Sequence, residues 1–325
     1  MITIDLYCGA GGFSTGAEIS GLSVAAAVDV WDTAVEVHTR NHPQTAHYCE
    51  DLTAFDFDAL PSFDLLLASP PCQGHSSAGR ATRAKSAKVD QTHAAQRAAA
   101  WAVVDCMRIH RPRAVVIENV PELLAWDSLS DWLGSMTDLG YSISTQVLTA
   151  SRWGVPQRRR RAIVIASLGQ PIRVEDPNTS ERPAIDCYDP DAGEWREISS
   201  IREMPTDLPR TAKRTTSRQR ATISNERARG RLAWGMHVNA PASWGRDPHA
   251  GPVQTLTTQS GSQLFWTLDG RYRLWSTREL LRAMSFPETY NLDGIGRTIA
   301  GKLLGNAIPP MLAAGVIDHV IRRAC

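Results

Sequence analysis

The chain has 325 residues, of which 42% are hydrophobic, 21% charged and 7% aromatic. These values are typical of globular proteins and exclude disordered, collagen-like and fibrous classes. The formal net charge of +1 does not by itself indicate an acidic or a basic partner. A chain of this length suggests about two domains, and it can bury a large core without disulfide bonds.

Three features of the sequence concern its location and its cysteines. No uninterrupted apolar run reaches about 18 residues, so we expect no membrane-spanning segment. Residues 1–6, MITIDL, lack the basic region and the long apolar stretch of a signal peptide. The six cysteines form no CxxC pair, which argues against a disulfide framework or a zinc site. We therefore expect a cytoplasmic protein without a metal.

The first half of the chain alternates short apolar strands with helical segments. Strands are predicted at 2–7, 24–28, 63–68, 114–117, 146–149 and 162–166. Helices are predicted from residue 17 and over 32–40, 94–109 and 129–139. This alternation predicts an α/β fold, an open sheet with helices on both faces. Ligands of such sheets bind beyond the carboxyl ends of the strands, so the residues that follow each strand are the first candidates for a site.

Beyond about residue 170 the composition changes. Residues 171–270 are rich in Pro, Asp, Ser, Thr and Arg and predict a loop-rich second domain. Arginines concentrate between 152 and 231, which is typical either of a phosphate-rich partner or of a solvated charged face. Helical character returns near 274–286 and over 301–323. We predict a cofactor-binding and catalytic domain at 1–170, a second domain at 171–270, and a segment at 271–325 that returns to the first domain.

A glycine-rich turn follows the first strand. Gly9, Gly11 and Gly12 would let main-chain N–H groups approach a ligand at the start of a helix. The spacing is not GxGxxG, which counts against a dinucleotide, so the turn indicates either a nucleotide-like cofactor or only a tight turn. Asp29 follows the second strand, where a carboxylate typically accepts hydrogen bonds from ribose hydroxyls. An acid that begins a helix is the alternative.

A cysteine follows the strand predicted at 63–68. Pro70 and Pro71 fix the backbone immediately before Cys72. The polar and basic segment 80–91 could close over a substrate as a lid. A rigidly presented thiol beside a lid suggests a nucleophile. A buried cysteine in a turn is the alternative.

Charged side chains follow or precede two further strands. Glu118 comes directly after the strand predicted at 114–117, where it could face Cys72 across a pocket, although it could also only cap a helix. Alternate residues of an extended segment share a face, so we expect Arg159 and Arg161 to point together. Two guanidinium groups on one face suit a carbonyl oxygen or a phosphate. A solvated basic strand end is the alternative.

Taken together, these segments resemble the cytosine-C5 DNA methyltransferases of bacterial or phage type, over essentially the whole chain. The resemblance rests on an ordered set of motifs: DLYCGAGGF at 5–13, PPCQ at 70–73, ENV at 118–120, Gln157 with Arg159 and Arg161, Arg278 with Glu279, and GNAIPP at 305–310. It implies a Rossmann-like methyltransferase sheet with helices on both faces and a smaller target-recognition domain. The implied reaction transfers a methyl group from S-adenosyl-L-methionine to C5 of cytosine in double-stranded DNA.

The resemblance also implies a role for each motif. Cys72 would add to C6 of the cytosine, and Glu118 would hold N3 and the exocyclic amine. Arg161, supported by Arg159, would contact the O2 carbonyl of a base that is flipped out of the duplex. The cofactor would be lined by Tyr7, Cys8, Gly9, Gly11, Gly12, Phe13, Asp29, Asp51, Leu52, Pro71, Asn306 and Ile308. Further substrate contacts would come from Gln73, Ser76, Asn119, Gln157, Thr255 and Leu256.

Two positions depart from the family pattern. His75 stands where many members carry phenylalanine, and Val30 stands where some relatives place a tryptophan against the adenine. Two alternatives stay open, a tRNA cytosine-C5 methyltransferase and a catalytically silent DNA-binding module of the same fold. The silent module would predict the loss of Cys72, Glu118 or Arg161, and all three are present.

We expect a monomer, because one chain carries every motif and no coiled-coil pattern is visible. The sequence leaves open which DNA site is recognised and which base removes the C5 proton. It also leaves open whether a cognate restriction endonuclease acts on the same site and whether the cofactor carries a group larger than methyl.

Overall fold

The computed structural model describes residues 1–71, 87–177, 179–197, 232–235, 246–262, 264–268 and 271–324, and for 87–97, 197, 262 and 265 only the backbone. Cys72, Gln73, Ser76 and most of the predicted lid at 80–91 lie outside the described residues. The chain forms two compact units. The first comprises Met1–Trp153, Arg160–Asn178 and Ala307–Cys325, and the second comprises Gly154–Arg159 and Thr179–Asn306.

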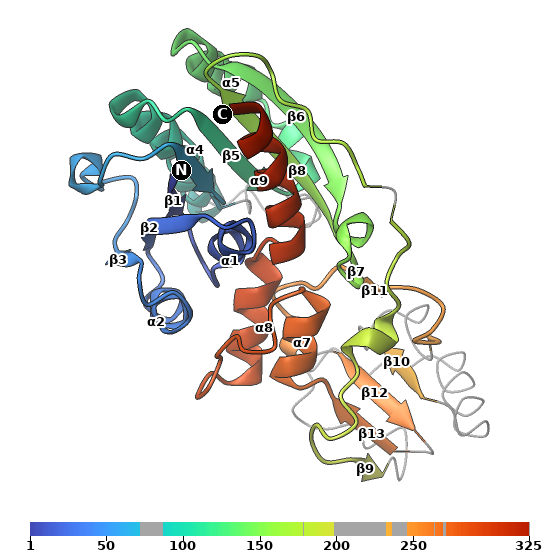
Figure 1. Ribbon diagram of the computed structural model, residues 1–325. Helices are drawn as coiled ribbons and strands as arrows, with labels where there is room; N and C mark the ends of the chain where they lie inside the picture. Colours follow the sequence, from blue (N-terminus) through green and yellow to red (C-terminus); the bar gives the residue numbers. More distant parts are fainter. Residues whose placement is uncertain are drawn as a thin grey trace. The chain divides into compact units, whose positions relative to one another are not determined.

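A seven-stranded sheet with the order β3-β2-β1-β4-β5-β8-β6 forms the centre of the first unit (Figure 1). Its strands are β1 (Ile2–Leu6), β2 (Ser23–Asp29), β3 (Ala46–Cys49), β4 (Leu65–Ala68), β5 (Ala114–Asn119), β6 (Ser142–Thr149) and β8 (Arg160–Ser167). Strands β1 to β5 pair in parallel, so their carboxyl ends meet at one edge. Strand β8 is antiparallel to both β5 and β6 and therefore begins at this edge. A site here would draw side chains from the ends of β1 to β5 and from the start of β8.

Helices cover both faces of this sheet. They are α1 (Gly12–Ile19), α2 (Asp32–Asn41), α4 (Ala87–His110), α5 (Leu129–Asp138) and α9 (Pro310–Ala324), with short 3-10 helices η1 (Phe57–Ala59), η2 (Pro121–Ala125) and η3 (Ala150–Trp153). On one face, Met107 of α4 and Trp132 of α5 pack with Leu66 and Ile117 in the main hydrophobic core. The other face carries α1 with α9 beside it (Figure 1). The predicted open α/β sheet with helices on both faces is confirmed.

Glycine allows α1 and the segment that leads into α9 to approach closely. A Cβ atom on Gly12 would lie 2.1 Å from the carbonyl oxygen of Ile308, and one on Gly16 would lie 2.5 Å from the Cβ of Ala313. Neither distance is compatible with a side chain, so α1 needs both glycines. Residues far apart in the sequence are thereby joined at the start of the first helix.

The second unit contains a four-stranded antiparallel sheet with the order β10-β12-β13-β9. Its elements are β7 (Gln157–Arg158), η4 (Ala184–Cys187), β9 (Arg196–Glu197), β10 (Ala233–Gly235), β11 (Val253–Gln254), η8 (Ser260–Ser262), β12 (Phe265–Leu268), β13 (Arg271–Leu274), α7 (Thr277–Ala283) and α8 (Arg297–Asn306). Strands β7 and β11 pair in parallel outside that sheet. Trp234, Trp266 and Trp275 form its buried aromatic core, and the rings of Trp266 and Trp275 stack at 4.9 Å.

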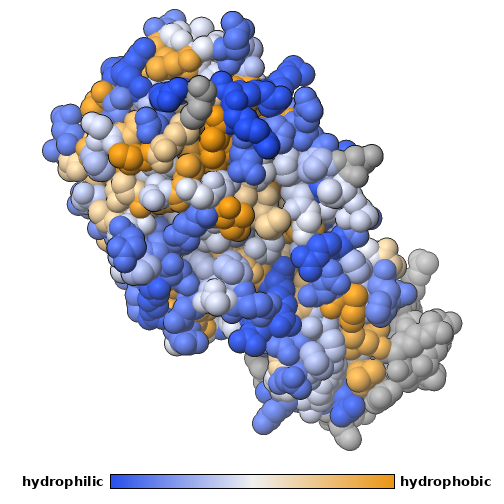
Figure 2. Space-filling view, in the orientation of Figure 1, coloured by the Kyte–Doolittle hydropathy of each residue, from blue (hydrophilic) through white to orange (hydrophobic). Residues whose placement is uncertain are grey.

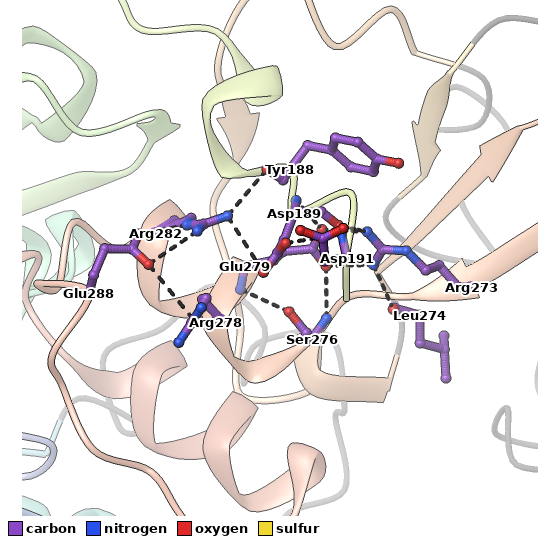
Figure 3. Close-up of polar contacts among 10 residues, drawn as sticks. All are labelled: Tyr188, Asp189, Asp191, Arg273, Leu274, Ser276, Arg278, Glu279, Arg282 and Glu288. Atoms are coloured by element: carbon purple, nitrogen blue, oxygen red, sulfur yellow. Dashed lines mark hydrogen bonds and ion pairs between the residues drawn. The ribbon is translucent and has the colours of Figure 1, made fainter. Parts of the chain in front are cut away.

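A buried ion pair fixes the start of α7 in the second unit (Figure 3). Arg273 Nη1 lies 2.7 Å from Glu279 Oε2, and Nη2 donates to Oε1 at 2.8 Å. The same carboxylate accepts hydrogen bonds from the main-chain N–H groups of Ser276 and Asp189. Ser276 Oγ in turn accepts from the N–H of Glu279, which completes a capping box. One carboxylate therefore joins β13, α7 and the loop at Asp189.

The chain divides differently from the predicted boundaries. Residues 154–159 and 271–306 belong to the second unit, whereas 171–178 and the chain from Ala307 onward belong to the first. The helix predicted at 301–323 is two helices, α8 and α9, separated by 307–309. The break has a local cause, because Pro309 and Pro310 disfavour helical geometry in the residues before them, and Pro310 takes the first position of α9.

Length and composition alone would allow one described helical stretch, 297–324, to cross a membrane. However, 61% of its most apolar window is buried inside the structure, as expected of core helices. Among the described residues, Val30 is the most exposed of the large hydrophobic side chains, at 66%. On the face in view in Figure 2, hydrophobic residues lie in small groups between hydrophilic ones.

Candidate active site

Glu118 and Arg161 meet at the carboxyl edge of the first unit's sheet. Glu118 lies near the end of β5 and Arg161 near the start of the antiparallel β8. Arg161 Nε lies 2.5 Å from Glu118 Oε1, and both side chains are almost completely buried. The contact is a close ion pair, but Oε1 has no well-aligned hydrogen bond among the described residues. A buried carboxylate oxygen that still needs a donor is suited to binding an N–H group.

Asn119 ties this edge to the chain that leads to Cys72. Its Nδ2 donates to the carbonyl oxygen of Pro70 at 3.0 Å, and its Oδ1 accepts from the N–H of Val120 at 2.9 Å. Pro71 follows Pro70 and is exposed. The Asn119 amide therefore holds the main chain two residues before Cys72. Its predicted contact with the substrate stays a prediction.

The turn between β1 and α1 has unusual backbone geometry. Tyr7, Gly9 and Gly11 have φ values of 59°, 52° and 71°. Asp29, at the end of β2, holds this turn, because its Oδ2 accepts from the N–H of Gly9 at 2.9 Å while Oδ1 accepts from that of Trp31 at 2.9 Å. Burial raises the pKa of Asp29, and the two main-chain donors act in the opposite direction. Each carboxylate oxygen keeps a further lone pair for a ligand.

Other residues predicted to line the cofactor divide into buried and exposed groups. Cys8, Phe13 and Ile308 are buried, and burial raises the pKa of the Cys8 thiol. Gly12 faces the Ile308 main chain, as described above. Asp51 is exposed and accepts two hydrogen bonds from Thr53 through Oδ1, whereas its neighbour Leu52 is buried. Their contacts with a cofactor stay predictions.

Gln157 has a structural role within the second unit. Its fully buried Nε2 donates to the Ala283 carbonyl at 2.9 Å, and its Oε1 accepts from the N–H of Leu256 at 2.8 Å. Thr255 Oγ1 donates to the carbonyl oxygen of Arg158 at 2.8 Å. Predicted substrate contacts of Gln157, Thr255 and Leu256 are untested, but these groups hold β7 and β11 together.

The two arginines predicted to share a face have different surroundings. Arg159 lies between β7 and β8, is fully buried, and donates from Nη1 to the Leu256 carbonyl at 2.8 Å and from Nη2 to the Gly305 carbonyl at 2.7 Å. Arg161 instead pairs with Glu118. The strand geometry on which the prediction rests is interrupted, because Arg159 belongs to neither strand. Asn306, the last residue of α8, is exposed in the second unit.

The family model for C-5 cytosine-specific DNA methylases matches residues 1–322. The chain belongs to this family. The type II methyltransferase M.HindV of Haemophilus influenzae is 30% identical over 56% of this chain and 58% of its own length. M1.HphI of Haemophilus parahaemolyticus is 24% identical over 98% of this chain and 86% of its own length. The methyltransferase Dnmt2 of S. pombe has a similar fold, with a TM-score of 0.68 at 14% identity, over 99% of this chain and 98% of its own.

The comparisons confirm the family and the methyltransferase fold predicted from the motifs. Methylases of this family generally use S-adenosylmethionine, so this is the cofactor with which the site is to be compared. The turn at 7–11 fits the adenosyl part of such a molecule. It combines left-handed main-chain conformations, the Asp29 carboxylate and, directly after it, the exposed apolar side chain of Val30.

Sequence reasoning missed one group of polar residues in this methylase, the buried side chains beneath the turn. Asp5, Ser14 and His38 are all at most 1% exposed and are linked by hydrogen bonds. A signal was present, because Asp5 interrupts the otherwise uncharged strand ITIDL. Its partners in α1 and α2 carry no recognisable spacing, so only the fold shows that they meet.

Proposed function

We propose that this methylase transfers a methyl group from S-adenosyl-L-methionine to C5 of a cytosine that is flipped out of a specific duplex DNA sequence. Family membership supports the reaction class. The observation that carries the proposal is the buried Glu118–Arg161 pair, which sits at the carboxyl edge of the sheet and is tied through Asn119 to the chain before Cys72. These groups supply what addition to the cytosine ring requires.

Cys72 is the nucleophile in this proposal, a role that rests on the PPCQ motif. Its sulfur adds to C6 of the ring, and the electron pair of the C5–C6 double bond makes C5 nucleophilic. The bound cofactor supplies an electrophilic methyl group. After transfer, C5 loses its proton to a base, the C6–S bond breaks, and the thiolate is restored. The thiolate is the reactive form, so the site must favour it over the thiol.

Glu118 and Arg161 stabilise the ring while it carries charge. The Glu118 oxygen that lacks an aligned hydrogen bond accepts one from the exocyclic amine of the cytosine, beside N3. Arg161 places a positive charge beside Glu118, and its guanidinium contacts the O2 carbonyl. Preorganised charges in a buried site stabilise developing charge more strongly than water does. Flipping the base out costs a few kcal/mol, which contacts from the protein repay.

Residues of the turn and the following strands bind the cofactor. Asp29 accepts hydrogen bonds from ribose hydroxyls, Val30 packs against the adenine, and Asp51 lies near the adenine amino group. The second unit carries the recognition of the DNA sequence. Because the relatives are type II methyltransferases, we infer that a restriction endonuclease with the same recognition sequence acts separately, and that the methylase works as a monomer.

The test is transfer of label from S-adenosyl-L-methionine carrying a labelled methyl group. Unmodified duplex DNA and tRNA are offered separately, to the wild type and to Cys72→Ser. Cys325→Ser, at the far end of the chain, is the matched thiol control. We expect label at C5 of cytosine in duplex DNA with the wild type and the control, and none with Cys72→Ser. Label in tRNA alone would assign the RNA reaction, and DNA binding without any label would indicate a silent module.

A further inference from the structure

A chain of hydrogen-bonded side chains runs from β3 to the middle of β1 within the first unit. His47 Nε2 lies 2.7 Å from His38 Nδ1, and His38 Nε2 lies 2.9 Å from Ser14 Oγ. Ser14 Oγ donates to Asp5 Oδ2 at 2.7 Å. Asp5, Ser14 and His38 are buried, whereas His47 is half-buried. The chain therefore connects a buried carboxyl group to a side chain that reaches solvent.

The hydrogen bonds in this chain have a fixed direction while Asp5 is ionised. Ser14 has one hydroxyl proton, which the carboxylate accepts, so His38 Nε2 must carry a proton and donate it to Ser14 Oγ. Burial, followed by the neighbouring histidines, lowers the pKa of His38 well below its usual value. His38 is then neutral, its Nδ1 accepts, and His47 Nε2 donates to it. Each link has one donor and one acceptor.

The surroundings of Asp5 favour its neutral form. Asp5 Oδ1 is buried and has no hydrogen-bond partner within the described part of the chain. Burial raises the pKa of Asp5 to about 7, Ser14 opposes this through its hydrogen bonds, and the charge of Asp29 on β2 adds to the rise. Cys8 in the turn is the other titratable neighbour. Strand β4, LLLA, carries no titratable side chain.

We call this hydrogen-bonded chain of His47, His38, Ser14 and Asp5 the relay. Its two histidines have titratable neighbours of their own. His42 packs its ring 4.5 Å from that of His38, and its Nδ1 lies 2.7 Å from Glu18 Oε1 on α1. Burial lowers the pKa of His47, and His42 adds to the effect. The described residues include no group of three His, Cys, Asp or Glu side chains placed to share a metal ion.

Asp5 lies directly beneath the turn that the proposed function assigns to the cofactor. It is two residues before Tyr7, where the left-handed backbone of the turn begins. Its charge adds to the rise in the pKa of Cys8, and the charge of Asp29 adds to the rise in its own pKa. The proposed cofactor is a sulfonium cation, and loss of its methyl group leaves a neutral thioether. A negative charge in a buried, weakly screened position favours a cation over a neutral ligand of the same shape.

We propose that Asp5 exchanges a proton with solvent through Ser14, His38 and His47, and that ionised Asp5 makes the turn select the sulfonium cofactor over its thioether product. The inference rests on the proposed function and adds to it a specificity-determining residue. When a proton from solvent binds Nδ1 of His47, each group of the relay passes one proton to the next group. His47 Nε2 gives its proton to His38 Nδ1, His38 Nε2 to Ser14 Oγ, and Ser14 Oγ to Asp5 Oδ2. Asp5 is then neutral, and His47 keeps one proton on Nδ1.

The test is titration calorimetry with S-adenosyl-L-methionine and, separately, S-adenosyl-L-homocysteine between pH 6 and 8. If the cation binds only the ionised form, its affinity is about tenfold weaker at pH 6 than at pH 8, because one proton is linked to binding. Near pH 7, binding of the cation should release a proton, which is seen as a heat that depends on the buffer. Affinity for the thioether should change much less.

Two variants and one control separate Asp5 from other titrating groups. Asp5→Asn keeps an acceptor for Ser14 but no charge, so it should lose the proton release and part of the preference for the cation. Ser14→Ala removes a hydrogen bond that favours ionised Asp5, so the rise in affinity should move to higher pH. His110→Gln, outside the relay, should match the wild type. Protonation of the ligand itself affects the wild type, both variants and the control equally, so it does not contribute to the differences between them.

Equal pH dependence in the wild type and Asp5→Asn would overturn the inference. If Asp5→Asn does not fold by circular dichroism, an unshifted profile in Ser14→Ala would overturn it equally. Failure of the wild type to bind either ligand at any pH would contradict the proposed function instead. The two failures are therefore distinguishable.

Discussion

We predict that the Glu118–Arg161 ion pair contributes to the free energy of unfolding as well as to catalysis. Arg161→Ala leaves the Glu118 carboxylate buried without its partner, which should lower the free energy of unfolding by about 3–5 kcal/mol. Arg158→Ala is the matched control. Its pair with Glu181, at 2.7 Å, is largely exposed and should contribute less than about 1 kcal/mol. Urea unfolding followed by circular dichroism measures the free energy of unfolding of both variants. An equal decrease in the two would contradict the larger contribution predicted for the buried pair.

At the residue scale, the sequence predicts positions better than it predicts partners. Glu118 and Asp29 could be assigned to one sheet edge, because each follows an apolar strand and parallel strands end together. The surroundings of Arg159 could not be predicted, since its acceptors are the main-chain carbonyls of Leu256 and Gly305. Every residue has a main-chain carbonyl, so the residue types in the sequence do not show which carbonyls accept these hydrogen bonds. The same applies to Gln157, whose amide bonds main-chain groups and Met284.

At the scale of elements, two helical glycines give opposite predictions. Gly12→Ala would place a methyl group 2.1 Å from the Ile308 carbonyl oxygen, so α1 and the chain before α9 must move apart. We expect the free energy of unfolding to fall by about 1–3 kcal/mol or more, as at other overpacked core positions. The measurement is the shift of the thermal unfolding midpoint.

Gly134→Ala is the control for that variant. Gly134 lies within α5, and an added methyl group would contact nothing within 4 Å. Alanine is favoured over glycine in a helix interior by roughly 0.5–1 kcal/mol, so this variant should be slightly more stable than the wild type. A lower midpoint for Gly134→Ala, or an unchanged one for Gly12→Ala, would contradict the packing described above.

The boundaries that sequence missed have local physical causes. Helix α1 begins at Gly12, five residues before the predicted start, because the glycines that suggest a turn are needed for packing against Ile308 and Ala313. Strand β3, AHYC, is short and only half apolar, and its pairing with β2 decides its conformation. The long apolar strands and helices were predictable because periodicity reflects their burial directly.

At the scale of the whole molecule, the two units should respond separately to mutation. Glu279→Ala leaves Arg273 buried without its partner and removes the carboxylate half of the capping box of α7. We expect the second unit to lose about 3–5 kcal/mol, while the first unit keeps its stability. Hydrogen exchange measured by mass spectrometry should be faster than in the wild type in β12, β13 and α7. The exchange rates of β1, β4 and β5 should not change.

Glu288→Ala is the matched control within the same network. Its carboxylate is 56% exposed and pairs with Arg282 at the surface, so its loss should cost less than about 1 kcal/mol. Faster exchange throughout both units in Glu279→Ala would show that the molecule unfolds as one cooperative body.

The contact between Gly12 and Ile308 also affects how this protein is made. The first unit is discontinuous in sequence, and α9 packs on a helix that was synthesised almost 300 residues earlier. At roughly 5–20 residues per second of synthesis, α1 waits for at least about fifteen seconds before its partner leaves the ribosome. During that time its small apolar face is uncovered, and the second unit is synthesised in the interval. The first unit is therefore complete only after the whole of the second unit has been synthesised.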